Sequence, residues 1–252
     1  MSSKDKLRKF RENETFKCLY QPKTEEVLNA SYPLKGKWAK EVFGNDNPIV
    51  LELGCGKGEY TIALSEKFPN KNFIGIDIKG ARLWKGAKYA EEHNLNNVLF
   101  IRTRIEFITS LFAEGEISEI WITFPDPQLK RCRKRLTGTL FLQRYKQFLS
   151  PQGIINLKTD SKYLHNYTLA LATQNSLDIL EADNNIYNSG RADEILSIKT
   201  FYEAHYIKRG LAITYMAFRI NNTKPLAEPE WDEDYWLAEE AVGRENTPAN
   251  KG

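Results

Sequence analysis

A glycine-rich segment directly after a short apolar run constrains the fold of this chain more than any other feature. Residues 48–53 read PIVLEL, which is typical of a buried parallel strand, and residues 54–58 read GCGKG. Glycines at this spacing allow a sharp turn and a close approach of the backbone to a ligand. Asp77 ends the next apolar run, 19 residues after Gly58. An acidic side chain at that point can bind the hydroxyl groups of a nucleotide-like ligand.

Strand-like and helix-like segments alternate through most of the sequence. Short apolar runs predict strands at residues 48–53, 72–78, 98–103, 119–124, 153–160, 177–187 and 211–220. Amphipathic segments predict helices at residues 58–68, 81–93, 106–112, 139–150 and 161–175. Such alternation predicts an α/β, doubly wound, Rossmann-like sheet that is mostly parallel. Residues 188–209 are too short and polar for a standard crossover, so we expect an antiparallel last strand.

The sequence divides into three predicted regions. Residues 1–47 mix charges, prolines and aromatic side chains without a sustained period and are expected to form an N-terminal extension. Residues 48–220 form the predicted domain, and residues 221–252 are expected to be an acidic, mobile tail. That tail has eight acidic and three basic residues, so its charge is −5 and the other 220 residues carry +8. The imbalance is consistent with a polyanionic partner or with an ordinary solvated surface.

Several classes of protein do not fit this sequence. No stretch approaches the ~18 apolar residues of a membrane-spanning helix, and the charged N-terminus lacks the apolar core of a secretory signal. The three cysteines and three histidines are scattered without a pairing pattern or metal-ligand spacing. We therefore expect a cytoplasmic protein that needs neither a membrane nor a metal. The sequence leaves open whether it is a monomer or a homodimer.

Two classes of cofactor compete for the glycine-rich turn. Dinucleotide-binding turns follow the pattern G-x-G-x-x-G, whereas this chain has G-C-G-K-G with Glu52 two residues before the first glycine. The form E-L-G-C-G-x-G resembles motif I of class I methyltransferases, which implies S-adenosylmethionine as cofactor. A glycine turn that binds no ligand is the structural alternative. The candidate cofactor-binding residues are Glu52, Gly54, Gly56, Gly58, Asp77 and Arg104.

The segment after the fourth long strand carries the candidate catalytic residue. In open α/β sheets, ligands bind beyond the carboxyl ends of the strands. Asp126 follows such a strand and lies between Pro125 and Pro127, which fix the backbone and pre-position the carboxylate. The alternative is that Asp126 only forms a turn or caps a helix.

A dense basic run follows this aspartate. Five cations within six residues are typical of contacts with nucleic-acid phosphates, although a solvated surface is the simpler alternative. The candidate RNA-binding residues of this run are Lys130, Arg131, Arg133, Lys134 and Arg135.

Two further segments contribute candidate substrate residues. The sequence LKTD places Lys158 and Asp160 at the end of the fifth long strand, at the same edge of the sheet. Further along, Thr200, Tyr202 and Glu203 precede the last strand, where they could contact a target base. Thr200 and Glu203 also have the spacing of a capping box, so a helix start is the alternative interpretation.

These motifs together resemble the bacterial tRNA (guanine-N7-)-methyltransferase (TrmB) family. The resemblance covers roughly residues 47–220 and rests on F-P-D-P, K-R, L-K-T-D and I-K-T-x-Y-E in this order after E-L-G-C-G-K-G. It implies methylation of the guanine at position 46 in the variable loop of tRNA. It also implies that Glu52, Asp77 and the position of Arg104 contact the cofactor, and that residues 132–137 contact RNA.

The same resemblance implies a substrate site. Its members would be Asp126, Lys130, Asp160 and residues 200–203. The family commonly reads D-P-W-P-K where this chain has Gln128-Leu129, and Arg104 replaces an acidic or amide residue.

The reaction that this resemblance implies needs no general base, because guanine N7 carries a lone pair and no proton. Orientation and electrostatics are then the main contribution of the enzyme. Two alternatives stay open at this point: a protein of this fold that binds tRNA without chemistry, and a methyltransferase for another base or for protein.

Overall fold

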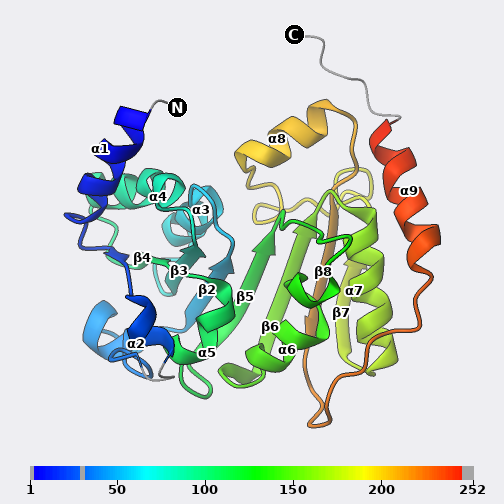
Figure 1. Ribbon diagram of the computed structural model, residues 1–252, viewed down its shortest axis with the longest axis horizontal. Helices are drawn as coiled ribbons and strands as arrows, with labels where there is room; N and C mark the ends of the chain where they lie inside the picture. Colours follow the sequence, from blue (N-terminus) through cyan, green and yellow to red (C-terminus); the bar gives the residue numbers. More distant parts are fainter. Residues whose placement is uncertain (1–2, 29–31, 246–252) are drawn as a thin grey trace. The chain divides into compact units, whose positions relative to one another are not determined.

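Alternating apolar runs and amphipathic segments of the chain fold into strands and helices, as Figure 1 shows for the computed structural model. The structure describes residues 3–28 and 32–245. These residues form two compact units, the first from the described residues up to 121 together with 147–150, and the second from residues 122–146 and 151–245. Strands β5 (Ile117–Thr123) and β6 (Leu149–Thr159) each begin in the first unit and end in the second.

The first unit has a parallel arrangement of strands in the order β1-β4-β3-β2. These strands are β1 (Leu19–Tyr20), β2 (Ile49–Leu53), β3 (Asn72–Asp77) and β4 (Val98–Arg102). The helical segments of this unit are α1 (Ser3–Asn13), α2 (Thr24–Leu28), the π-helical turn η1 (Trp38–Phe43), α3 (Glu59–Lys67), α4 (Gly80–Glu92), the 3-10 turn η2 (Ile105–Phe107) and α5 (Ile108–Leu111). Every residue of β2 and β3 is buried, as their apolar sequences predict.

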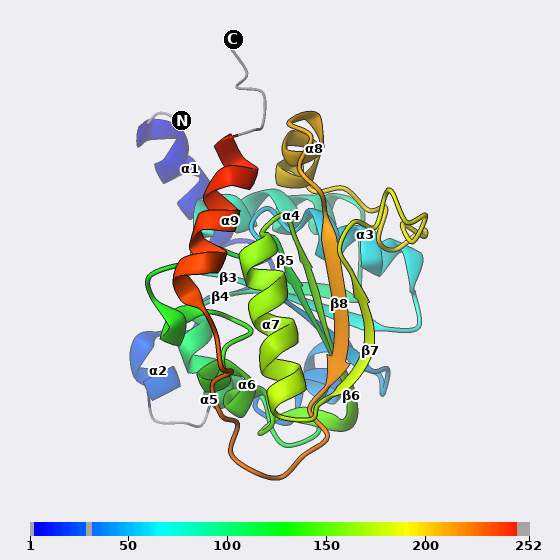
Figure 2. The same cartoon turned by 90° about the vertical axis from the view of Figure 1, so that its right-hand side faces the viewer.

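The second unit contains the antiparallel part of the fold. Strand β8 (Thr214–Arg219) lies between β6 and β7 (Asp178–Asp183) and pairs antiparallel with both. Its helical segments are the 3-10 turn η3 (Cys132–Lys134), α6 (Thr139–Tyr145), α7 (Lys162–Gln174), α8 (Phe201–Lys208) and α9 (Glu233–Glu245). Figure 2 shows α7 running along one face of these strands, with α9 beside it. The expected α/β fold, mostly parallel with an antiparallel last strand, is confirmed.

The ring of Phe100 fixes how closely β4, β3 and α4 can approach the glycine-rich turn. Phe100 is fully buried, and a Cβ atom added at Gly58, Gly75 or Gly86 would lie 2.6–2.8 Å from an atom of this ring. Real Cβ atoms do not approach other atoms so closely, so glycine is required at these three positions by packing. A Cβ at Gly86 would also lie 2.9 Å from the carbonyl oxygen of Lys57 in the turn.

The predicted N-terminal extension is part of the first unit. Trp38 has no exposed surface, its indole nitrogen donates to the carbonyl of Leu111 at 2.8 Å, and its ring contacts Tyr20 and Tyr32. Asn13 at the end of α1 donates to the carbonyl of Gly80 at 2.9 Å. The sequence did not predict this integration, because the aromatic residues concerned have no regular spacing.

The predicted acidic tail contains helix α9 within its described part, residues 221–245. Glu240 on this helix is 4% exposed and accepts a hydrogen bond from the backbone N–H of Tyr163 at 3.0 Å. The sequence carries no signal for this contact with α7, and the mobility of the tail stays a prediction. Residues 246–252 lie outside the described part, and the boundaries at residues 47 and 220 stay predictions.

Substitution of Gly86 by alanine tests the packing around Phe100. A Gly-to-Ala change inside a helix normally stabilises it by about 1 kcal/mol. Here overpacking against Phe100 and Lys57 should exceed that gain and lower the free energy of unfolding by about 1 kcal/mol or more, measured by denaturant titration. In a Phe100→Leu background the same change should cost less, because the leucine removes the nearest ring atoms. A stabilised Gly86→Ala protein would contradict this interpretation.

Candidate functional site

The glycine-rich turn of the first unit is held by backbone hydrogen bonds to the neighbouring strand. Gly54 and Cys55 both donate to the carbonyl of Ile76 on β3, at 2.8 and 3.0 Å, and Gly58 donates to the carbonyl of Cys55 at 2.8 Å. Gly54 and Gly56 have φ angles of 74° and 58°, which L side chains rarely adopt. A Cβ at Gly54 would meet no atom within 4 Å, and one at Gly56 would meet only the carbonyl oxygen of Gly54, at 4.0 Å. The backbone of the turn is therefore open to a ligand.

Asp77 connects this turn to the start of α4. One carboxylate oxygen accepts a hydrogen bond from the backbone N–H of Gly56 at 3.0 Å, and the other accepts one from the N–H of Lys79 at 2.7 Å. The residue is 8% exposed, so its orientation is fixed. Each oxygen keeps a further acceptor site, because a carboxylate oxygen has two lone pairs. Asp77 can therefore accept hydrogen bonds from two ribose hydroxyls while it keeps those from Gly56 and Lys79.

Glu52 lies on β2, two residues before the turn. It is 3% exposed and accepts a hydrogen bond from the hydroxyl of Thr61 on α3. Burial, with a further contribution from the charges of Glu52 and Asp77, raises the pKa of Cys55 well above its usual value. Two carboxylates thus lie on either side of the turn in the sequence, and the turn itself contains the buried thiol of Cys55. Acidic groups beside an open glycine backbone fit the amino-acid and ribose parts of S-adenosylmethionine.

Arg104 follows β4, where the sequence predicted a cofactor contact. Its side chain is 54% exposed, and a guanidinium nitrogen lies 3.2 Å from a carboxylate oxygen of Glu106. The structure thus places Arg104 in an exposed ion pair after the strand. Its contact with the cofactor stays a prediction.

The segment that carries Asp126 has an unusual backbone. Phe124 and Gln128, on either side of the Pro-Asp-Pro sequence, have φ angles of 49° and 51°. Asp126 is exposed, and its carboxylate accepts a hydrogen bond from the N–H of Gln128 at 3.0 Å. Non-glycine residues with positive φ cost free energy and occur often at functional sites. The turn therefore presents Asp126 to solvent in a defined orientation.

Four of the five cations in the basic run are accessible. Lys130, Arg131, Arg133 and Lys134 are exposed, and they lie on or beside turn η3. An exposed group of cations can contact successive phosphates. We call residues 129–135 the basic loop.

Arg135 differs from this prediction, because it is 2% exposed. Its guanidinium nitrogen Nη2 donates to the carbonyl of Leu129 at 3.1 Å, to the hydroxyl of Tyr163 and to a carboxylate oxygen of Glu233 at 2.8 Å. The guanidinium also lies over the rings of Tyr163 and Tyr167, 4.9 and 4.5 Å from their centres. A cation so enclosed is not available to a phosphate in this conformation.

Glu203 is placed in a buried ion pair. Glu203 and Lys158 have no exposed side-chain surface, and Lys158 Nζ lies 2.8 Å from the carboxylate. The other carboxylate oxygen accepts a hydrogen bond from the hydroxyl of Tyr187 at 2.7 Å. Burial, partly offset by the charge of Glu203, lowers the pKa of Lys158. This arrangement differs from the predicted base contact for Glu203, since the carboxylate is occupied by partners that the sequence did not indicate.

Thr200 begins helix α8. Its hydroxyl accepts a hydrogen bond from the N–H of Glu203 at 3.2 Å, so the interpretation of a helix start is correct for this residue. Tyr202 in the first turn of α8 is 39% exposed, next to Phe201, which is 59% exposed. These exposed rings are available for contact with a base.

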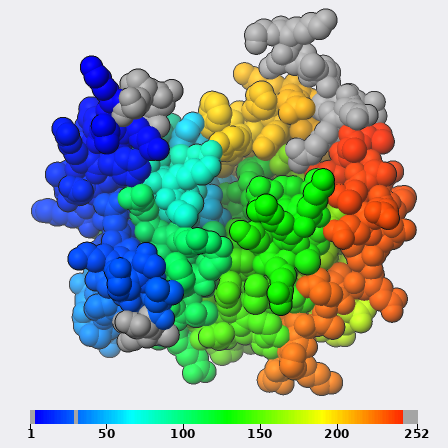
Figure 3. All heavy atoms as spheres, viewed as in Figure 1, coloured from blue at the N-terminus to red at the C-terminus, as the bar shows by residue number. Residues whose placement is uncertain are grey.

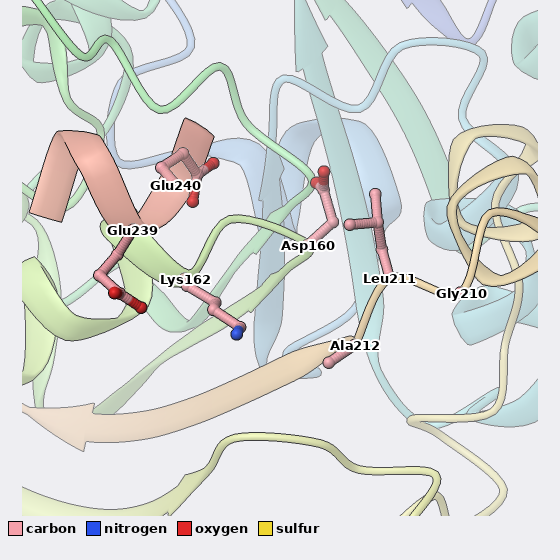
Figure 4. A pocket seen from close by; sticks show the side chains of 7 residues that line it. All are labelled: Asp160, Lys162, Gly210, Leu211, Ala212, Glu239 and Glu240. Carbon is pink, nitrogen blue, oxygen red and sulfur yellow. The ribbon is translucent and has the colours of Figure 1, made fainter. Parts of the chain in front are cut away.

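Asp160 lines a small cavity in the second unit, of about 150 Å³. Figure 4 shows side chains that reach it from the end of β6, the start of α7, the segment before β8 and helix α9. The lining residues are Asp160, Lys162, Gly210, Leu211, Ala212, Glu239 and Glu240. The contribution of α9 was not predicted, because the sequence of the tail carries no motif.

Two features are absent from the part of the chain that the structure describes. Residues 3–28 and 32–245 contain no group of three or more histidine, cysteine, aspartate or glutamate side chains that could hold a metal ion. In the same part of the chain, no helix is both long and apolar enough to span a membrane.

Known proteins are similar to this chain over most of its length. Residues 46–216 match a family model described as "Putative methyltransferase". The tRNA (guanine-N(7)-)-methyltransferase of Christiangramia forsetii is 56% identical over 223 residues, which are 87% of this chain and 100% of the relative. The enzyme of the same name from Bacteroides thetaiotaomicron is 48% identical over 227 residues, or 90% of each chain.

Solved structures show the same fold at low sequence identity. The 16S rRNA methyltransferase KamB has a TM-score of 0.54 at 12% identity, covering 71% of this chain and 90% of that one. An antibiotic-related methyltransferase has a TM-score of 0.52 at 18% identity, with the same coverage. These similarities concern the fold alone.

Substitution of Asp77 by asparagine tests the candidate cofactor site. The amide keeps one acceptor oxygen but loses the charge, so hydroxyl donors should bind less tightly. We expect the affinity for S-adenosylmethionine to fall roughly tenfold or more, since hydrogen bonds to charged groups contribute about 1.5–3 kcal/mol. Isothermal titration calorimetry measures this directly, and the melting temperature of the variant serves as the control for folding. An unchanged affinity would remove Asp77 from the site.

Proposed function

Because this chain belongs to the tRNA (guanine-N(7)-)-methyltransferase family, we propose that it methylates N7 of the guanine at position 46 in the variable loop of tRNA. The observation that carries the proposal is the identity of 56% to a tRNA (guanine-N(7)-)-methyltransferase over the full length of that relative. The choice of position 46 is supported by the resemblance of the F-P-D-P, L-K-T-D and I-K-T-x-Y-E segments to this family. Such an enzyme acts on tRNA, so we place it in the cytoplasm.

The chain provides a place for the methyl donor in its first unit. The donor is S-adenosylmethionine, which supplies an electrophilic methyl group on a sulfonium. In the proposed site the open backbone at Gly54 and Gly56 approaches the donor, and Asp77 accepts hydrogen bonds from its ribose. Glu52 on β2 accepts a hydrogen bond from Thr61 on α3 and so connects the two elements on either side of the turn. These residues bind and orient the donor, and none of them has to transfer a proton.

Asp126 is the proposed catalytic residue of the second unit. Guanine N7 has a lone pair and no proton, so the enzyme contributes orientation and electrostatics. The carboxylate of Asp126 can accept hydrogen bonds from guanine N1–H and the exocyclic amino group. It would also offset the positive charge that methylation leaves on the purine. Adenine presents an acceptor at N1, so a carboxylate there favours guanine.

Exposed cations of the basic loop are the proposed contacts for tRNA phosphates. Lys130, Arg131, Arg133 and Lys134 are exposed, whereas Arg135 is left out of this set because it is buried. The N7 edge of a base is hidden in the narrow major groove of an A-form helix, so a base in a loop is the accessible target. Tyr202 of α8 and Asp160 at the end of β6 are proposed to contact the nucleotide. Glu203 would support this region through its ion pair with Lys158.

Nucleoside mapping tests the proposed function as a whole. Unmodified tRNA transcripts are incubated with the protein and S-adenosylmethionine, digested, and analysed by mass spectrometry. We expect 7-methylguanosine in the fragment that contains the variable loop. A transcript with adenine at position 46 should stay unmethylated. Methylation at another position would contradict the assignment of the site.

Replacement of Asp126 by asparagine should slow methyl transfer while leaving the turn intact. The amide is similar in size and keeps the oxygen that accepts from Gln128, but it carries no charge and presents a donor to the base. We expect the single-turnover rate on tRNA to fall by about a hundredfold or more, the scale of losing a preorganised electrostatic partner. The affinity for S-adenosylmethionine should change little. A near-normal rate would mean that Asp126 only shapes the turn.

Removal of the exposed cations at positions 131, 133 and 134 by alanine substitution should weaken tRNA binding. Each phosphate contact that is lost should reduce the slope of log affinity against log salt by about 0.7–0.9. The control replaces Lys37 and Lys40, exposed cations of the first unit, and should change this slope less. Filter binding at several salt concentrations gives both slopes. Equal slopes for wild type and triple variant would identify this surface as an ordinary solvated one.

A further inference from the structure

Arg135 joins both ends of the basic loop to the rest of the second unit. Its guanidinium nitrogen Nη2 contacts the carbonyl of Leu129 at 3.1 Å, so the first and last residues of the loop are linked directly. The same nitrogen contacts the hydroxyl of Tyr163 on α7 and the carboxylate of Glu233 on α9. Arginine is rarely buried without a charged partner. The position of this guanidinium therefore depends on Glu233.

Glu233 is held in place for this contact. It accepts a hydrogen bond from the hydroxyl of Tyr163 at 2.7 Å in addition to that from Arg135. These two hydrogen bonds, that from Tyr163 first, lower the pKa of Glu233, so the carboxylate is charged at neutral pH. The side chain remains 50% exposed, so it can be changed without opening the core.

Other residues of the C-terminal segment, residues 221–245, contact α6 and α7 beside Arg135. Glu228 accepts hydrogen bonds from the hydroxyl of Tyr167 at 2.7 Å and from Thr139, the first residue of α6. The ring of Trp231 packs edge to face against Tyr163 and Tyr167, with centres 5.5 and 5.7 Å apart. In Figure 3 this segment, coloured orange to red, borders the green surface of the same unit.

The basic loop does not pack tightly against the C-terminal segment. A cavity of about 620 Å³ is lined by Cys132 and Arg133 from the loop and by Glu228, Trp231 and Glu233 from the segment, among others. Backbone hydrogen bonds shape the loop locally: the N–H of Lys134 donates to the carbonyl of Arg131 at 2.7 Å, and the N–H of Arg135 to that of Cys132 at 3.0 Å. The side-chain hydrogen bonds of Arg135 connect this turn to Leu129 and to helices α7 and α9 across the open side.

We propose that Glu233 is a positioning residue for tRNA binding: through Arg135 it holds the basic loop in the conformation that presents Lys130, Arg131, Arg133 and Lys134 to phosphates. This proposal rests on the proposed function, in which the loop binds tRNA. Glu233 belongs to a segment beyond residue 216, where the match to the family model ends. In this proposal the acidic segment, residues 221–245, contributes to tRNA binding by the second unit.

The positioning role and a purely electrostatic role of Glu233 predict opposite changes in tRNA affinity when its charge is removed. A carboxylate near a bound polyanion repels it, so removing its charge should strengthen tRNA binding if charge alone matters. A segment that competes with RNA for the basic loop would give the same result. If Glu233 positions the loop, removing its charge weakens tRNA binding instead.

The test compares Glu233→Gln with Asp234→Asn, which removes the same charge from the next, exposed residue. The probe is an unmodified tRNA transcript. For Glu233→Gln we expect the KM for tRNA and the Kd for tRNA to rise roughly five- to tenfold, a modest value because the side chain is half-exposed. The kcat at saturating tRNA and the affinity for S-adenosylmethionine should stay within about twofold of wild type. Asp234→Asn should bind tRNA as well as wild type or slightly better.

A second measurement follows the loop without tRNA. Cys132 in the loop is exposed, Cys55 is buried, and burial raises the pKa of Cys18 to about 12. A nitroxide reagent should therefore label Cys132 first. In Glu233→Gln the spectrum of this label should show faster motion than in wild type, and in Asp234→Asn it should not.

The two measurements distinguish the possible failures. Tighter or unchanged tRNA binding by Glu233→Gln, or unchanged label motion, would overturn the positioning role. A wild-type protein that neither binds nor methylates tRNA would overturn the proposed function instead, while the label would still report whether Glu233 holds the loop.

Discussion

The packing of Phe100 against three glycines is the constraint on which the first unit depends. The ring occupies space that side chains at Gly58, Gly75 and Gly86 would need, so β3, β4 and α4 come close to the turn after β2. That closeness allows Ile76 to accept hydrogen bonds from Gly54 and Cys55 and allows Asp77 to hold the N–H of Gly56. The open side of the turn, where a donor would lie, is thus a result of tight packing on its other side.

In the second unit, ion pairs hold functional segments in position, as close packing around Phe100 does in the first. Arg135 and Lys158 are buried cations, and each has a carboxylate partner, Glu233 and Glu203. Both pairs lie next to segments proposed to contact tRNA, the basic loop and helix α8. Lys158 and Glu203 are both buried, so removing either one is costly because the other charge remains without compensation, whereas Glu233 is half-exposed and its removal costs less. These pairs can therefore fix the shape of surfaces whose own residues are polar and exposed.

Much of the fold could be predicted because its signals are local. The glycine turn, Asp77 and the alternation of strands and helices depend on residues close in sequence, as does the cap that Thr200 provides. The burial of Arg135 and Glu203 could not be predicted in this way. The charged partners of Arg135 and Glu203 lie 98 and 45 residues away in the sequence. A charged residue within a polar stretch is therefore predicted to be exposed. Trp38 was missed for a related reason, since one aromatic residue without periodic neighbours gives no pattern.

The stacked tryptophans at the C-terminal end give the protein an optical property. Trp231 and Trp236 lie with ring centres 5.4 Å apart and nearly parallel, and Tyr163 and Tyr167 meet the first of them edge to face. Aromatic rings held rigidly in an asymmetric environment give near-ultraviolet circular dichroism, which is lost when the packing becomes mobile. The five tryptophans of the chain include these two. Docking of α9 onto α7 should therefore have its own spectroscopic signature, readable in solution without any label.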